Sequence, residues 1–117
     1  MVYTSSTQAL AVLENLVHIN PPVIFKYVAV PFQFEDALLE IFPITNLPSD
    51  WKEEPPPLST QAIGDLWVRE QRSCVLALPS AIVPRELNYM INPAHQDFGQ
   101  ISIGRSEPFT FDPRLLT

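Results

Sequence analysis

Thirteen prolines stand against only three glycines in this 117-residue chain, and they divide it into short segments. Most of the prolines fall between apolar runs, at Pro21-Pro22, Pro43, Pro48, Pro55-Pro56-Pro57, Pro79, Pro84, Pro93, Pro108 and Pro113. Proline fixes φ and has no backbone N–H, so it interrupts helix interiors and central strands. The pattern therefore predicts many short elements and argues against a helical bundle.

Two segments have the apolar spacing of helices. The first covers residues 7–19, begins after a cap at Ser5 or Ser6 and stops at Asn20-Pro21-Pro22. One face of this helix carries Leu10, Leu13, Glu14 and Val17. The second helix begins at Ser59 or Thr60 and ends near residue 70. Its predicted inward-facing side chains are Ile63, Leu66 and Trp67.

Apolar runs, β-branched and aromatic at residues 23–32, predict the strands, at residues 2–4, 23–32, 73–78, 87–92, 100–103 and 109–111. Residues 37–44 fit either a strand or a short helix, and residues 45–58 read as a surface loop anchored by Trp51. Two main helices with more strands than helices predict an α+β fold with mainly antiparallel sheets. The length favours a single domain over residues 1–117.

The charge and the cysteine count restrict the partners and the compartment. A formal net charge of −6 disfavours direct nucleic-acid binding and favours a basic partner. Cys74 is the only cysteine, which excludes an internal disulfide, argues against a cysteine-based metal site and suits a reducing cytoplasm. The apolar runs are too short to span a bilayer, and the first residues do not resemble a signal peptide.

Three residues are candidates for chemistry, and each has a structural alternative. Glu14 interrupts an apolar helix face, where a carboxylate must be paired or functional, unless it reaches solvent at the edge of that face. Tyr3 could stack on a flat cofactor or be a core tyrosine. Ser80 follows an apolar strand and could bind a ligand or only cap a turn. Taken alone, the residues favour the structural alternative in each case.

Familiar catalytic motifs are absent. The chain contains neither GxGxxG nor GxxxxGK[ST], so no phosphate-binding glycine loop is expected. His18 and His95 lack the HExxH spacing, and no metal is expected. Ser80, His95 and Asp97 form a triad on paper, but no GxSxG motif surrounds the serine. His18 is better explained by a favourable interaction with its helix dipole.

Four segments, taken in order, resemble the RES-domain family. They are residues 2–14, with VYTSS leading to ALAVLE, then LPSDW at 47–51, TQAIGD at 60–65, and VLALPSAIVP at 75–84 running on through Glu86, Asn88 and Asn92-Pro93 to FTFDPR at 109–114. The resemblance implies an ADP-ribosyltransferase-like fold and a bacterial toxin paired with an Xre-type helix-turn-helix antitoxin. It also implies NAD⁺ as the substrate, cleaved at the nicotinamide–ribose bond by phosphorolysis, hydrolysis or ADP-ribosyl transfer.

The same resemblance assigns roles to the three candidates. Glu14 and Ser80 match the glutamate and serine of the family's name, and Tyr3 matches the tyrosine of its NAD⁺ pocket. Glu14 would stabilise the cation-like ribose, Ser80 would hydrogen-bond the ribose or a phosphate, and Tyr3 would stack on the nicotinamide. The family's arginine and an early strand belong to a segment before Tyr3, and the chain opens at Met1.

That arrangement predicts little or no NAD⁺ consumption by residues 1–117 alone, and a gain when an upstream arginine-bearing segment is restored. A catalytically inactive RES-fold module that holds the antitoxin is the alternative. A homodimer is left open.

Overall fold

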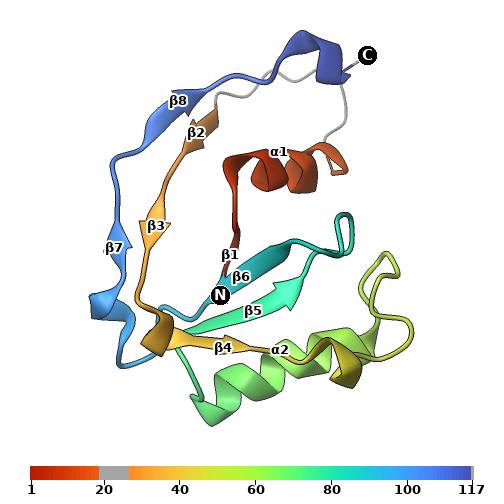
Figure 1. Cartoon of the computed structure of the whole chain (residues 1–117), viewed down its shortest axis with the longest axis vertical. Helices are drawn as coiled ribbons and strands as arrows, with labels where there is room; N and C mark the ends of the chain where they lie inside the picture. Colours follow the sequence, from red (N-terminus) through yellow and green to blue (C-terminus); the bar gives the residue numbers. More distant parts are fainter. Residues whose placement is uncertain (19–26, 117) are drawn as a thin grey trace.

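The computed structural model describes residues 1–18 and 27–116. In these ranges the α-helices are α1 (Gln8–Leu16) and α2 (Leu58–Glu70). The strands are β1 (Val2–Ser5), β2 (Tyr27–Ala29), β3 (Phe32–Gln33), β4 (Leu39–Ile41), β5 (Val75–Pro79), β6 (Leu87–Ile91), β7 (Ser102–Ile103) and β8 (Glu107–Phe109). The expected α+β class with two α-helices is confirmed (Figure 1). The predicted stop of the first helix and the predicted start of the next strand lie outside the described residues.

The largest sheet has four strands in the order β1-β6-β5-β4. Its pairings are antiparallel except for β4 with β5, which are parallel, so the sheet is mixed as expected. β2 pairs with β8 and β3 with β7, both antiparallel, and together they form an arm beside the main sheet (Figure 1). β1 is an edge strand of the main sheet, and it leads directly into α1.

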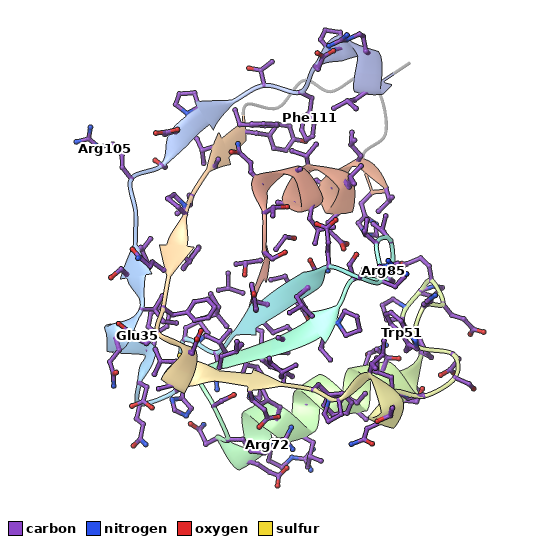
Figure 2. All side chains as sticks on the ribbon, in the orientation of Figure 1. Glu35, Trp51, Arg72, Arg85, Arg105 and Phe111 are labelled. Carbon is purple, nitrogen blue, oxygen red and sulfur yellow. The ribbon has the colours of Figure 1, made fainter. Side chains whose placement is uncertain are left out.

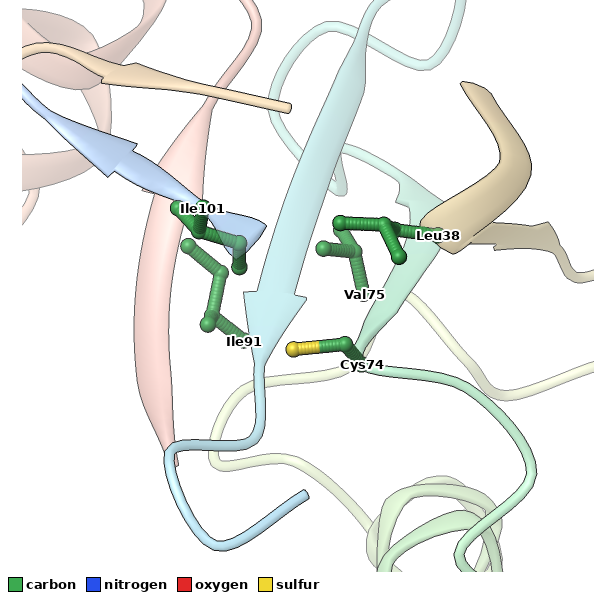
Figure 3. Close-up of a cluster of buried hydrophobic side chains, with 5 residues drawn as sticks. All are labelled: Leu38, Cys74, Val75, Ile91 and Ile101. Atoms are coloured by element: carbon green, nitrogen blue, oxygen red, sulfur yellow. The ribbon is translucent and has the colours of Figure 1, made fainter. Parts of the chain in front are cut away.

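Alternation along β5 and β6 gives the main sheet two buried faces. Val75 pairs with Ile91, and both point into a cluster with Cys74, Leu38 and Ile101 (Figure 3). The cluster is dry enough that burial raises the pKa of the Cys74 thiol, with the Asp97 carboxylate adding to the effect. The cluster fills this face around Val75 and Ile91, and a second cavity of about 570 Å³ lies beside it, between β1 and the arm.

The opposite face packs against α2. Leu76 pairs with Met90 there, and both contact Trp67 of the helix, which is fully buried. Ile63 is half-buried, whereas Leu66 is 45% exposed, so its predicted inward orientation is wrong. Adjacent helical residues are rotated by about 100° around the helix axis, so Leu66 points away from the sheet when Trp67 points into it. Only a narrow stripe of α2 therefore contacts the sheet.

The apolar face of α1 is also narrower than its spacing predicts. Leu10 is buried, but Leu13 and Val17 are 40% and 59% exposed. The cap of α1 is Thr7, whose hydroxyl accepts the backbone N–H of Leu10 at 3.1 Å, and not Ser5 or Ser6. Ser5 instead belongs to β1, because the strand runs further along the chain than predicted.

The structure also refines three predicted strand regions and the start of α2. The predicted strand at 23–32 appears in its described part as β2 and β3, with Pro31 between them unable to donate a ladder hydrogen bond. The ambiguous stretch at 37–44 contains both alternatives, a 3₁₀ turn at Asp36–Leu38 followed by β4. The last strand lies two residues earlier than predicted, and α2 begins at Leu58, just before the predicted start.

Candidate functional site

A cleft of about 580 Å³ opens over the Met90 face of the sheet, beside α2. Its walls come from β1, α1, β5, β6, the loop that precedes α2 and the first turn of α2. The lining residues that matter below are Tyr3, Ser5, Glu14, Trp51 and Asn88. The volume is within the range of small-molecule sites, which lies at roughly 300–1,000 Å³.

Glu14 is half-buried on α1 and faces this cleft. Its Oε1 accepts two hydrogen bonds, from Ser80 Oγ at 2.6 Å and from Asn88 Nδ2 at 2.7 Å. Charge-assisted bonds of this length are stronger than those between neutral groups, so they hold the carboxylate in one orientation. Among the described residues, no donor bonds Oε2, which leaves that oxygen to a ligand in the cleft.

Ser80 lies directly after β5 and is fully buried. Its oxygen accepts the backbone N–H groups of Ile82 and Val83, both at 3.1 Å. With both lone pairs in use, the single hydroxyl proton goes to Glu14. The structure therefore brings Ser80 and Glu14 together, but places the serine behind the carboxylate and outside the cleft lining.

Two aromatic side chains flank the cleft. Tyr3 of β1 lies opposite Met90 and is 72% exposed, so its ring is open to a ligand and is not part of the core. Trp51 lies in the loop before α2, where the sequence predicts it to be an anchor, and its ring has the Lys52 ammonium 5.4 Å from its centroid. A flat ring bound between such walls would gain stacking contact.

The charge of the cleft is negative. Glu53 and Glu54 line it together with Glu14, whereas none of the described lysines and arginines does. Arg72 is paired with Glu40 and Glu70 at the far end of α2, and Arg105 points away on the outer arm (Figure 2). Within the described residues, no guanidinium lines the cleft, whereas a diphosphate would favour one there.

The paper triad of Ser80, His95 and Asp97 is not assembled. His95 is buried, with Nε2 3.1 Å from the Gln71 carbonyl and Nδ1 accepting the Asp97 backbone N–H at 3.0 Å. Both ring nitrogens are therefore engaged by the backbone. His18 lies at the cleft, but no cluster of three metal-ligating side chains occurs within residues 1–18 and 27–116.

Sequence reasoning did not single out Asn88 or Ser5 as members of the site. Ser5 Oγ donates a hydrogen bond to Asn88 Oδ1 at 2.8 Å, and Asn88 Nδ2 in turn donates one to Glu14 Oε1. A signal for Asn88 was present in the strand pattern, because it alternates in phase with the buried Met90. A polar residue in a core-facing phase needs a partner, and here the partner is a carboxylate.

Comparison with known proteins agrees with this architecture. Residues 1–112 match the family model of the RES domain. The chain belongs to the RES-domain family. The chain is 34% identical to a protein named Toxin Res from Yersinia enterocolitica, over 97% of this chain and 76% of that protein. It is 36% identical to a protein named Prs ADP-ribosylating toxin from Sphingobium sp., over 99% of this chain and 74% of that protein.

A third relative, named Toxin Res and found in Photorhabdus laumondii, is 35% identical over 98% of this chain and 75% of its own length. The RES chain therefore spans about three quarters of the curated relatives that it matches. Within the described residues, no helix is both long enough and apolar enough to cross a membrane.

Proposed function

We propose that this RES-family chain is a bacterial toxin of a toxin–antitoxin system that acts in the cytoplasm and consumes NAD⁺ by cleaving its nicotinamide–ribose bond. The proposal treats residues 1–117 as one RES-like domain. The observation that carries it is the Glu14 carboxylate, pinned through Oε1 by Ser80 and Asn88 inside an open cleft, with Oε2 left to a ligand. A relative named as an ADP-ribosylating toxin supports the same substrate.

The chemistry needs a fixed negative charge beside the ribose. When the glycosidic bond breaks, its electron pair moves to the ring nitrogen of nicotinamide, and the ribose carbon becomes cation-like. A carboxylate that is already oriented stabilises this charge without first rearranging. In this proposal Glu14 supplies that charge, Tyr3 stacks on the leaving nicotinamide, and Ser80 holds Glu14.

The acceptor of the ADP-ribosyl group is water, phosphate or a protein side chain. Each acceptor donates an electron pair to the ribose carbon and loses a proton, so each leaves a different product. A product analysis therefore tests the function and the reaction class together.

Incubation of the purified chain with NAD⁺, with and without phosphate, should release nicotinamide. We expect the rate to be low, because no arginine among the described residues lines the cleft to hold the diphosphate. Chromatography would distinguish ADP-ribose, ADP-ribose 1-phosphate and labelled protein. If NAD⁺ remains intact in both conditions over long incubations, the proposed activity is refuted.

The acidic cleft also supports the alternative of an inactive binding module. An Xre-type antitoxin with basic side chains would complement Glu53 and Glu54 and plug the cleft. In either case, DNA contact would belong to the antitoxin, since the chain carries a net charge of −6. Salt-sensitive DNA binding by the isolated chain would contradict this assignment.

A further inference from the structure

We propose that Ser5 and Asn88 form a positioning arm for Glu14, so that a residue of the edge strand β1 controls the catalytic carboxylate of α1. The proposal rests on the proposed function for its kinetic consequence, but the arm itself is a structural claim. It consists of two hydrogen bonds in series, from Ser5 Oγ to Asn88 Oδ1 at 2.8 Å and from Asn88 Nδ2 to Glu14 Oε1 at 2.7 Å.

The strand register creates the first contact. β1 and β6 pair so that Ser5 lies directly opposite Asn88, although 83 positions separate them in the chain. Directly opposed side chains on one sheet face lie about 4.5–5.5 Å apart at Cβ, close enough for a hydroxyl to reach an amide. Both side chains face the cleft, and α1 lies beside the same end of the sheet (Figure 1).

The donor and acceptor roles have one consistent solution. A carboxylate can only accept, so the Asn88 amide must present its NH₂ group to Glu14. Its oxygen then faces β1, where the Ser5 hydroxyl donates to it. A flipped amide would set its oxygen against the carboxylate, and two acceptors would repel each other. In this orientation the amide oxygen of Asn88 needs a donor, and the Ser5 hydroxyl supplies it. This hydrogen bond keeps the side chain of Asn88 in place.

Two anchors are needed because a glutamate has three side-chain torsions to restrict. Ser80 fixes Oε1 from the end of β5, and Asn88 fixes the same oxygen from β6. One hydrogen bond restrains Oε1 from one direction only, whereas two, from β6 and from the residue after β5, restrain it from two directions. Holding a long side chain in one rotamer costs conformational entropy, so loss of the arm would let Oε2 leave its position.

The test compares Ser5→Ala, which removes the hydroxyl, with Ser5→Thr, which keeps it on a residue suited to strands. We expect kcat for NAD⁺ cleavage to fall about 10-fold in Ser5→Ala with KM changed less than about twofold, and to return in Ser5→Thr. Ser59→Ala is the matched control, because it also removes a serine bond to a side-chain oxygen, 3.1 Å from Asp50, outside the cleft lining. Thermal melting of each variant separates a positioning role from loss of fold.

A second measurement does not depend on activity. The side-chain amide protons of Asn88 report directly, by ¹H–¹⁵N NMR, on the bond to Glu14. We expect a downfield amide proton in the wild type that moves upfield in Ser5→Ala and is kept in Ser5→Thr and Ser59→Ala. An inactive wild type with this NMR pattern would refute the proposed function and support the arm. Unchanged Asn88 signals in Ser5→Ala, or a kcat loss that Ser5→Thr does not restore, would overturn the arm itself.

Discussion

Glu14→Gln should lower the rate of NAD⁺ cleavage by about 100- to 1,000-fold, the cost of removing one preorganised electrostatic contact. Glutamine has the shape of glutamate, and its carbonyl oxygen can still accept from Ser80 and Asn88. The variant therefore removes the charge and retains both anchors. Nicotinamide release over long incubations measures the loss, and a urea titration checks the fold.

Glu35→Gln is the control for this experiment. It changes the net charge by the same amount, and Glu35 lies at the corner between β3 and β4, away from Trp51 (Figure 2). Its side chain makes no capping hydrogen bond to the 3₁₀ turn that follows. We expect its rate to equal that of the wild type. Equal rates for Glu14→Gln and Glu35→Gln would refute the catalytic role of Glu14.

Trp67→Ala should lower the free energy of unfolding by about 3–5 kcal/mol, the range for large-to-small substitutions of buried aromatic residues. Trp67 is fully buried between α2 and the sheet, and its indole N–H donates to Ser73 Oγ at 2.8 Å. Truncation leaves a cavity against Leu76 and Met90 and removes this hydrogen bond. Since small domains are stable by about 5–15 kcal/mol, the variant should be close to unfolding.

Leu66→Ala tests whether the effect belongs to the buried face of α2. Leu66 is the preceding residue on the same helix and is 45% exposed, so we expect a loss of about 1 kcal/mol or less. Urea unfolding followed by circular dichroism measures both variants. Similar losses for the two substitutions would show that α2 packs through a different face.

The two large effects concern different parts of one arrangement. Trp67 holds α2 against the Met90 face of the sheet, and the cleft opens on that face beyond the helix. Glu14 reaches the same cleft from α1, whose position depends on β1. Loss of the tryptophan should therefore reduce activity through unfolding, whereas loss of the glutamate charge should reduce it with the fold intact.

Local chemistry in the sequence was enough to predict most of the elements, whereas the family resemblance gave Tyr3, Glu14 and Ser80 their roles as site candidates. Pro21-Pro22, the prolines at 55–57 and Pro79 separate the segments, and the apolar run before Pro79 predicts β5 with an error of two residues or fewer. These features act within a few residues of one another, which is why they can be read along the chain. The carboxylate of Glu14 on an otherwise apolar helix face could also be recognised from the residues around it.

Only the tertiary structure decided how the site is built. The contact between Ser5 and Asn88 depends on the register of two strands, and the bonds of Glu14 depend on where α1 lies against β5 and β6. Leu13 and Leu66 lie on predicted apolar helix faces but are exposed, because spacing defines a helix face and not how much of that face the rest of the protein covers. Hydrogen-bond geometry is set by residues distant in sequence, so Ser80 emerged as a support of Glu14 only once those residues were placed in space.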